Sequence, residues 1–317
     1  MAYNNRELTA ARQAAERGEN APPRVAITGI TGYVGRELAR AFADSGSEVL
    51  GLTRQNLSAT LKLPRSVQLR QIGDHTETLC ENFERFRPDV VIHLASLARR
   101  NHLVTDITPF FEANILLGAR LLEAMRVCGC FRFVTAESIL QFSVGGASRA
   151  TNLYAATKHA FAEILLYYTS AFGISAIALV LPTLYSEQET RAKLMTDVAA
   201  AVLNGTPLNL QAEAIEIDFV HIEDVARAFI RASGILMDAP VLSGTLSRYW
   251  IGSGVSVTPL ELVAMFERFS EKKIDVRWQH TNVNSRRPRP WSGPVLPGWV
   301  PQIDLETGIR KMLSTPR

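Results

Sequence analysis

Short apolar segments alternate with longer amphipathic segments along the chain from residue 23 onward. The apolar segments are typical of strands, and the run over residues 89–95 is apolar enough for a strand that is covered on both faces. The expected strands are residues 24–28, 48–53, 67–72, 89–95, 131–135 and 175–181. Helices are expected over residues 33–45, 114–127 and 154–172. This succession predicts an α/β fold built on a doubly wound parallel sheet.

Expected strands and helices alternate less regularly in the C-terminal part of the chain. Residues 218–224 are expected to form a turn that leads into a helix over 225–232. The stretch Thr-Pro-Leu-Glu at 258–261 has the spacing of a capping box with proline at the first helical position, which predicts a helix ending near residue 270. Residues 281–301, rich in Pro, Arg and Trp, are expected to be irregular.

The weaker alternation after Pro182 predicts a second, smaller α/β lobe. We expect the sheet domain to contain residues 23–182 and about 218–252. The second lobe would then contain residues 183–217 and 253–317. Residues 1–22 are polar and carry charges of both signs, so we expect them to form an exposed, flexible extension with helical character.

The composition is that of an ordinary globular protein. The chain has 317 residues, 47% hydrophobic and 21% charged, and its net charge of +3 is too small to indicate a nucleic-acid partner. Its sequence has neither an apolar run long enough to cross a membrane nor a secretion signal. Cys80, Cys128 and Cys130 are too few for a disulfide framework and lack further zinc ligands. We therefore expect buried free thiols, no metal and a cytoplasmic location.

A glycine-rich turn follows the first expected strand and precedes the first expected helix. Its glycines are Gly29, Gly32 and Gly35. Because they lack side chains, the backbone can approach a pyrophosphate, and the N-terminus of the next helix offers free N–H groups and a positive dipole end. In this context the pattern indicates a dinucleotide site; a purely structural tight turn is the alternative.

The end of the second expected strand indicates which dinucleotide binds. An acidic residue there would favour NAD by bonding the adenosine ribose hydroxyls, but the chain has Thr53 and Arg54. A hydroxyl and a guanidinium suit a 2′-phosphate, because Arg forms paired, charge-assisted hydrogen bonds with it. We therefore expect NADP(H), with a solvated Arg54 as the alternative. Asp74, after the third strand, is a candidate for the adenine amino group or for a turn residue.

Tyr154 and Lys158 lie four residues apart in an expected helix, so their side chains project from the same face. The phenol of tyrosine has a pKa of about 10, too high for easy proton exchange at neutral pH, and a nearby ammonium group lowers it. Ser138, just after the fifth expected strand, could orient a carbonyl and stabilise the developing oxyanion. These residues predict hydride transfer at a carbonyl, with Tyr154 handling the proton. A chance helical pair is the alternative.

Taken together, these motifs resemble an extended short-chain dehydrogenase/reductase of the nucleotide-sugar epimerase/dehydratase group. The resemblance covers about residues 23–270 and rests on the glycine turn, His93-Leu-Ala-Ser96, Asn114 with Gly118, Ser138, Tyr154-x-x-x-Lys158 and the stretch 218–226. It implies a Rossmann domain that binds NADP, a sugar-nucleotide lobe, and a homodimer formed through the helices over 114–127 and 154–172. The residues that it implies for the dinucleotide are Gly29, Thr31, Gly32, Tyr33, Val34, Gly35, Thr53, Arg54, Asp74, Leu94, Ala95, Ser96, Asn114, Tyr154, Lys158 and Leu181.

The residues after Ser138 differ between the enzymes of this group that catalyse different reactions. Its 4,6-dehydratases carry Asp-Glu there, whereas this chain has Ile139 and Leu140, which cannot exchange protons. Segments 152–161 and 121–125, together with Gln141 and 191–194, are similar to 4-ketoreductases of the CDP-abequose and CDP-paratose synthase type. The resemblance implies NADPH-dependent reduction of a CDP- or dTDP-linked 4-keto-6-deoxy sugar in deoxysugar biosynthesis. The substrate-binding candidates are Arg191, Lys193 and Arg287.

Three departures from the group indicate an unusual sugar or nucleotide. Glu137 stands where the residue before the catalytic hydroxyl is usually small, and residues 183–186 do not end in Tyr-Gly. Several arginines over 286–289 stand where the group often has one pyrophosphate-binding arginine; a solvated basic loop is the alternative. Two other functions stay open. One is a C4 epimerase with tightly bound NAD, and the other is a non-catalytic dinucleotide-binding regulator.

Overall fold

The computed structural model describes residues 22–54, 63–99, 101–142, 150–211, 216–240, 242–279 and 293–315. The expected N-terminal extension therefore lies almost wholly outside the described residues. The chain divides into two compact units. The first contains Met1–Val180, Ala226–Trp250 and Arg287–Pro297, and the second contains Leu181–Val225, Ile251–Arg286 and Gly298–Arg317. Residues 218–225, which the sequence pattern assigned to the sheet domain, fall in the second unit.

The first unit is built on a seven-stranded sheet with the order β10-β6-β5-β4-β1-β2-β3. The paired strands run parallel, which confirms the expected doubly wound arrangement. The strands are β1 (Arg24–Thr28), β2 (Glu48–Thr53), β3 (Gln68–Gln71), β4 (Val90–His93), β5 (Arg132–Ser138), β6 (Ser175–Leu181) and β10 (Leu246–Trp250). In a sheet of this kind ligands bind at the carboxyl ends of the strands.

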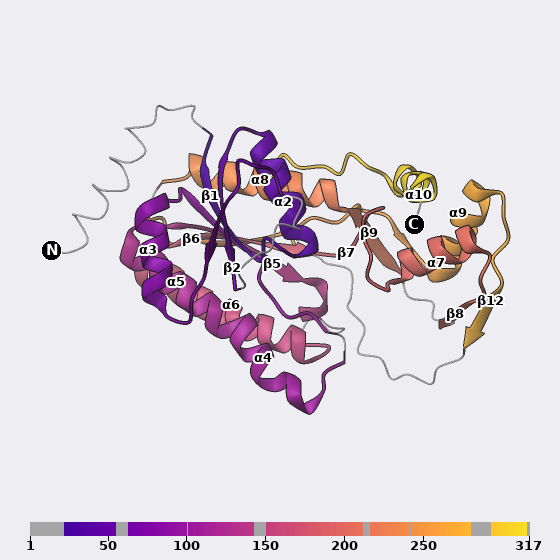
Figure 1. The fold of residues 1–317 in the computed structure, drawn as a ribbon, viewed down its shortest axis with the longest axis horizontal. Helices are drawn as coiled ribbons and strands as arrows, with labels where there is room; N and C mark the ends of the chain where they lie inside the picture. The colour runs from indigo at the N-terminus through magenta and orange to yellow at the C-terminus, as the bar shows by residue number, and fades with distance from the viewer. Residues whose placement is uncertain are drawn as a thin grey trace. The chain divides into compact units, whose positions relative to one another are not determined.

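Helices cover both faces of this sheet. Helices α3 (Thr76–Phe86), α5 (Leu117–Cys128) and α6 (Leu153–Phe172) lie on one face, and α2 (Tyr33–Asp44) and α8 (Ile222–Asp238) lie on the other (Figure 1). The core between the first face and its helices is apolar, with Leu121, Phe133, Phe161 and Leu165 among its buried members. Burial of these side chains fixes α6, and with it the residues on its first turns, against the sheet.

The helix expected from residue 114 begins earlier. Helix α4 (Ile107–Phe111), a π-helical turn (Glu112–Leu116) and α5 follow one another directly. Pro109 lies in the first turn of α4, where its missing N–H group would have no intrahelical partner in any case. The proline is therefore compatible with a helix that the sequence pattern did not predict.

The second unit has two small sheets and three helices in its described residues. A three-stranded sheet has the order β11-β9-β7, and β8 and β12 form a parallel pair. Its elements are β7 (Thr183–Tyr185), α7 (Leu194–Asn204), β8 (Leu208–Gln211), β9 (Ile217–His221), β11 (Ser256–Val257), α9 (Pro259–Ser270), β12 (Val276–Gln279) and α10 (Leu305–Ser314). Tyr185, Val198, Phe219, Phe266 and Ile309 are among the residues of its core.

The stretch 218–224 was wrongly predicted as a turn, because it forms most of β9 and the start of α8. Its two aspartates hold loops of the second unit. Asp218 accepts hydrogen bonds from the backbone and hydroxyl groups of Ser253, at 2.9 and 2.8 Å. Asp224 is fully buried and accepts the backbone N–H groups of Gln302 and Ile303, at 2.7 and 3.0 Å. A buried carboxylate requires such donors, so the two aspartates have structural roles.

The capping box at the start of α9 is confirmed. The Thr258 hydroxyl accepts the N–H group of Glu261 at 3.2 Å, and the Glu261 carboxylate accepts the N–H group of Thr258 at 2.7 Å. Each side chain thereby satisfies a backbone donor that lacks an intrahelical partner. None of the helices in the described ranges combines the length and the apolar character needed to cross a membrane.

Candidate active site

The glycine turn joins β1 to α2 in a conformation that requires glycine. Gly29 has a φ of +72°, and a Cβ at this position would lie 2.7 Å from the backbone nitrogen of Ala95. A Cβ at Gly35 would lie 2.2 Å from the carbonyl oxygen of Gly29. Gly32 is the N-cap of α2 and has no side chain to bond the first N–H groups of the helix. The turn therefore presents a backbone surface without side chains at the N-terminus of α2, which fits a pyrophosphate.

The other residues predicted to bind the dinucleotide follow neighbouring strands. Thr53 ends β2 and is buried, whereas Arg54 is exposed directly after it. Asp74 is exposed after β3, and Leu94, Ala95 and Ser96 follow β4 half-buried. Leu181 ends β6. Since parallel strands end at one edge, these residues and the glycine turn share the carboxyl edge of the sheet.

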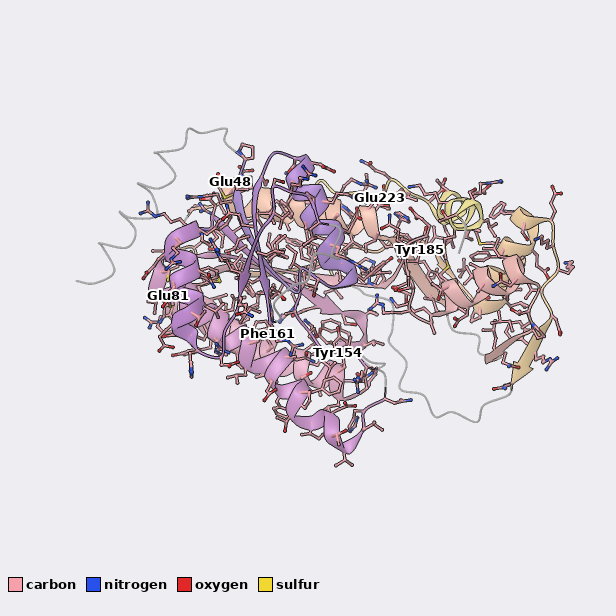
Figure 2. The ribbon with its side chains drawn as sticks, in the orientation of Figure 1. Glu48, Glu81, Tyr154, Phe161, Tyr185 and Glu223 are labelled. Atoms are coloured by element: carbon pink, nitrogen blue, oxygen red, sulfur yellow. The ribbon has the colours of Figure 1, made fainter. Side chains whose placement is uncertain are left out.

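Ser138 and Tyr154 lie in hydrogen-bonding contact. Ser138 ends β5, and Tyr154 lies on the first turn of α6, where the Asn152 side chain caps the helix by accepting the N–H group of Ala155 at 2.9 Å. Tyr154 projects from the same helix as Phe161 (Figure 2). Its hydroxyl is hydrogen-bonded to the hydroxyls of Ser138 and Ser96. Three hydroxyl groups from β5, α6 and the segment after β4 thus meet at one point.

The pKa of Tyr154 differs from the sequence-based expectation. Burial raises the pKa of the phenol, and the hydrogen bonds with Ser138 and Ser96 counteract only part of this effect. Lys158, which was expected to lower this pKa, is not among its causes, so that expectation is corrected for this structure. The physical reason is that removal of the phenol from water penalises the phenolate more than the hydrogen bonds with Ser138 and Ser96 compensate.

Lys158 is itself buried and influenced by two neighbours. Burial lowers the pKa of its ammonium group to about 8, and the negative charge of Glu137 acts in the opposite direction. His93 has a pKa of about 3, lowered first by burial and then by the charge of Lys158. His93 is therefore neutral at neutral pH, and its Nδ1 lies 2.7 Å from the hydroxyl of Thr28.

Asn114 holds the segment after β4 against α6. Its Oδ1 accepts hydrogen bonds from the Ser96 hydroxyl at 3.0 Å and the Leu97 N–H group at 2.7 Å. Its Nδ2 donates to the Leu97 carbonyl at 3.1 Å and the Thr157 hydroxyl at 2.8 Å. An amide has two donors and two acceptor sites, so these bonds use its full capacity. Asn114, predicted to contact the dinucleotide, positions Ser96 by these bonds.

Sequence reasoning named Glu137 and Gln141 but missed Arg248, which is the partner of Glu137. The carboxylate of Glu137, next to Ser138, accepts hydrogen bonds from the Arg248 Nε at 3.1 and 3.0 Å. Gln141 accepts the Ser138 N–H group at 2.8 Å through its Oε1. Glu137 could be singled out from the sequence because an acid stands where a small residue is expected. Its partner Arg248 on β10 had no local signal.

Two of the three predicted substrate residues lie together in the second unit. Arg191 and Lys193 both form ion pairs with Glu189, at 2.5 and 3.1 Å, and the Glu189 side chain is only 2% exposed. Glu189 was missed because it lies outside any helix, so its spacing from the two cations does not predict that they meet. The third candidate, Arg287, lies outside the described residues.

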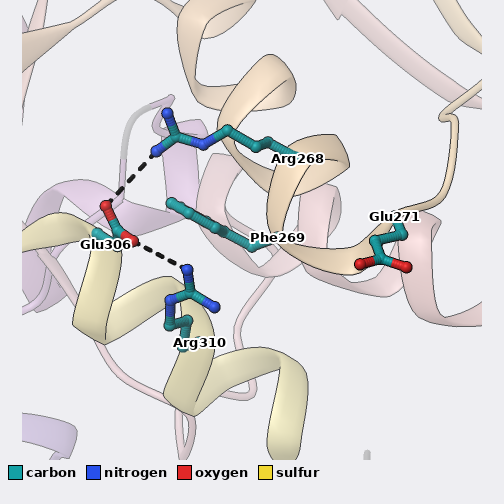
Figure 3. A pocket seen from close by; sticks show the side chains of 5 residues that line it. All are labelled: Arg268, Phe269, Glu271, Glu306 and Arg310. Carbon is teal, nitrogen blue, oxygen red and sulfur yellow. Dashed lines mark hydrogen bonds and ion pairs between the residues drawn. The ribbon is translucent and has the colours of Figure 1, made fainter.

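A surface hollow in the second unit contains none of the predicted site residues. It is lined by Arg268, Phe269, Glu271, Glu306 and Arg310. The guanidinium groups of Arg268 and Arg310 stack on Phe269 at 4.4 and 4.3 Å from its centroid, and Glu306 pairs with both (Figure 3). The positive charges of the two arginines are balanced by carboxylates within the hollow. The ion pairs and ring contacts of this cluster link α9 to α10.

One group in the second unit has the composition of a metal site. Glu187, His221 and Glu223 place potential ligand atoms within 4.8 Å of one another. However, the ammonium group of Lys311 lies 3.1 Å from the Glu223 carboxylate and supplies a positive charge there. Glu187 also lies 3.2 Å from the His221 Nε2, so we describe the group as an ion-pair cluster.

The family model of the NAD dependent epimerase/dehydratase family matches residues 25–235. The chain belongs to this family. CDP-abequose synthase from Salmonella muenchen is 24% identical over 306 residues, covering 92% of this chain and 97% of that protein. A probable UDP-glucuronate 4-epimerase from Rhizobium meliloti (strain 1021) is 23% identical, covering 92% and 96%. The UDP-glucose 4-epimerase of Thermus thermophilus, solved as a complex with NAD, is 25% identical with a TM-score of 0.75, covering 92% and 97%.

This member of the epimerase/dehydratase family has residues that fit the NAD(P) dinucleotide typical of the family. The close approach of Gly29 to Ala95 and the uncapped first turn of α2 provide a cradle that side chains would fill. Buried Lys158 and half-buried Tyr154 come from the helix after β5. The family match and the fold thus agree on the class of cofactor.

Proposed function

We propose that the protein uses NADPH to reduce the C4 ketone of a nucleotide-linked 4-keto-6-deoxy sugar. The observation that carries the proposal is the meeting of the Ser138, Tyr154 and Ser96 hydroxyls, with Lys158 one turn further along α6. CDP-abequose synthases from Salmonella muenchen and Yersinia pseudotuberculosis, each 24% identical, support a sugar-nucleotide substrate. This would place the enzyme in deoxysugar biosynthesis.

Bound NADPH would supply the hydride. The Ser138 hydroxyl would donate a hydrogen bond to the ketone oxygen and stabilise the charge that develops there. Tyr154 would then transfer its phenolic proton to this oxygen. The raised pKa of Tyr154 keeps the phenol protonated at neutral pH, which is the state that a reductase requires. Buried Lys158, one turn further along α6, would hold the ribose of the nicotinamide through its ammonium group.

The end of β2 supports NADPH over NADH. Arg54 is exposed directly after buried Thr53, at the sheet edge that carries the glycine turn. A guanidinium at this place can form paired hydrogen bonds with a 2′-phosphate. In the second unit, Arg191 and Lys193 are held by Glu189 and are our candidates for contacts with the sugar nucleotide.

The turn after Ser138 argues against dehydration. Ile139 and Leu140 occupy the first two positions of the 3-10 turn that ends at Gln141. Elimination requires an acid and a base beside the sugar, and aliphatic side chains supply neither. A reductase needs no further proton-transfer group beyond Tyr154.

A C4 epimerase with tightly bound NAD is the second candidate, supported by the similarity to UDP-glucose 4-epimerase with NAD. The first experiment is to follow NADPH oxidation with enzymatically generated CDP- and dTDP-4-keto-6-deoxyglucose, with NADH in parallel. Oxidation with either sugar would establish a 4-ketoreductase. Inactivity with both sugars would point to a different keto sugar or, if NAD copurifies with the protein, to the epimerase.

We further propose that the enzyme is a homodimer formed through α5 and α6. Apolar side chains on these helices and the preceding turn are exposed, with Leu116 at 52%, Val127 at 45%, Leu166 at 48% and Tyr167 at 57%. A second copy would remove this apolar surface from water. Sedimentation of the wild-type protein and of Leu166→Glu tests the interface, because the variant should dissociate.

A further inference from the structure

Glu137 is a buried carboxylate immediately before the catalytic Ser138. Its side chain is 4% exposed, and its ion-pair partner Arg248 is 36% exposed. The two residues are 111 positions apart in the chain. Burial of a carboxylate is costly unless a positive group and hydrogen bonds compensate for the lost water. The compensated charge lies one residue from Ser138, so its field acts on the groups around that hydroxyl.

The register of the sheet places Glu137 on the face that α6 covers. His93 of β4 pairs with Thr135 of β5, and residues paired in this way point to the same face. Glu137 follows Thr135 by two positions and therefore shares this face. The His93 ring contacts the Phe161 ring of α6 at a centroid distance of 5.3 Å. Lys158 lies one helical turn before Phe161, so Glu137 and Lys158 face the same layer between β5 and α6.

Arg248 reaches this layer across β6. It pairs with Ala178 of β6, and β6 lies between β10 and β5 in the sheet order. The guanidinium Nε then bonds both oxygens of Glu137, at 3.1 and 3.0 Å. The negative charge of Glu137 thus lies between two positive charges, that of Arg248 on β10 and that of Lys158 on α6.

We infer that Glu137 is a positioning residue that keeps Lys158 protonated, and that Arg248 limits the strength of this effect. The inference rests on the proposed function, in which Lys158 acts as an ammonium group. Glu137 touches neither the ketone nor the hydride donor in this scheme; it acts through Lys158.

The charges around Lys158 determine the direction in which each substitution should shift its pKa. Burial alone lowers the pKa of Lys158, and the Glu137 charge raises it, so that the outcome is about 8. His93 from β4 is neutral at neutral pH, and Tyr154 on α6 is protonated. Removal of the Glu137 charge should therefore lower the pKa of Lys158. Removal of the Arg248 charge should raise it, because the field of Glu137 is then less compensated.

The test is the pH dependence of dinucleotide binding, measured by fluorescence titration with NADPH and, in parallel, with NAD. Wild-type affinity should decrease as Lys158 loses its proton. Glu137→Gln should shift the midpoint of this decrease down by about one pH unit, and Arg248→Gln should shift it up. Arg248→Lys keeps the charge and should retain the wild-type midpoint.

Opposite shifts in the two charge-removing variants would support the inference, because a purely structural ion pair would weaken folding without moving a midpoint in either direction. Binding with unmoved midpoints would overturn the inference and leave the proposed function intact. Lack of binding of both dinucleotides to the wild type would instead overturn the proposed function. If Glu137→Gln does not fold, the comparison of Arg248→Gln with Arg248→Lys decides the question.

Discussion

Gly118 of α5 faces the ring of Phe161 of α6 so closely that a Cβ at residue 118 would lie 2.3 Å from Cε2 of the ring. The same ring contacts His93 and Phe133 on the sheet. The absence of a side chain at one position of α5 thus determines how closely α6 approaches α5. Helix α6 carries Tyr154 and Lys158, so this packing supports the site.

Gly118→Ala should destabilise the protein. In an exposed helix alanine is favoured over glycine by about 1 kcal/mol, but here the methyl group must displace Phe161, which typically costs about 1–3 kcal/mol. We expect a net decrease of about 1 kcal/mol in the free energy of unfolding, measured by urea denaturation. The matched control is Gly234→Ala in α8, where a Cβ would meet no atom within 4 Å. The control should be neutral or stabilising; equal losses in both variants would contradict the packing argument.

Tyr154→Phe should fold, bind NADPH and show very slow turnover. The variant keeps the ring but removes the proton donor, and general acid catalysis typically contributes a factor of about 100 to 10,000. The measurements are thermal unfolding, NADPH titration and NADPH oxidation with the keto sugar. Tyr167→Phe is the control, because Tyr167 lies on the same helix but is 57% exposed. Turnover near the wild-type level in Tyr154→Phe would remove Tyr154 from the mechanism.

Arg54→Ala should weaken NADPH binding more than NADH binding. Only NADPH carries the 2′-phosphate, and loss of a hydrogen bond to a charged group costs about 1.5–3 kcal/mol, or roughly tenfold or more in Kd. Titration of both dinucleotides against the wild type and the variant measures the difference. Arg85→Ala, an exposed residue of α3, should leave both affinities unchanged. Equal losses for NADPH and NADH in Arg54→Ala would refute the cofactor assignment.

Glu189→Gln should reduce the sensitivity of stability to acid. Burial acts to raise the pKa of Glu189, but hydrogen bonds and charges of Arg191 and Lys193 prevail and lower it from 4.5 to about 2. Since the folded-state pKa is lower than the unfolded one, the carboxylate stabilises the fold above pH 4.5, and this contribution is lost as the pH decreases toward about 2.

Urea denaturation at several pH values over this range measures the effect. The free energy of unfolding should decrease more steeply with acid in the wild type than in Glu189→Gln. Glu163→Gln, at an exposed position of α6, is the matched control and should follow the wild type. Parallel curves for the wild type and Glu189→Gln would contradict the lowered pKa of Glu189, because its carboxylate would then make no pH-dependent contribution to stability.

Features encoded by neighbouring residues could be predicted from the sequence. The glycine turn, the capping box at Thr258 and the contact between the Ser138 and Tyr154 regions depend on local spacing and on the order of strands in a doubly wound sheet. Strand β9 was missed because its partners, β7 and β11, lie far along the chain. Short strands of this kind are stabilised by pairing, and the pairing partner has no local signature.

The electrostatics of the site were the hardest to predict. The spacing of Tyr154 and Lys158 predicted a lowered phenol pKa, whereas burial raises it. Burial results from the packing of α6 on the sheet, which the four-residue spacing does not describe. The ion pair between Glu137 and Arg248 depends on the sheet order β10-β6-β5, which brings together residues from distant parts of the chain.

Strand β10 is the last strand in the sheet order, and it carries Arg248. The Arg248 side chain forms an ion pair with Glu137 on the interior strand β5. Loss of the guanidinium would leave the Glu137 carboxylate buried next to Ser138 without this partner. An electrostatic contact thus links the rim of the sheet to the residue that precedes the proposed oxyanion donor.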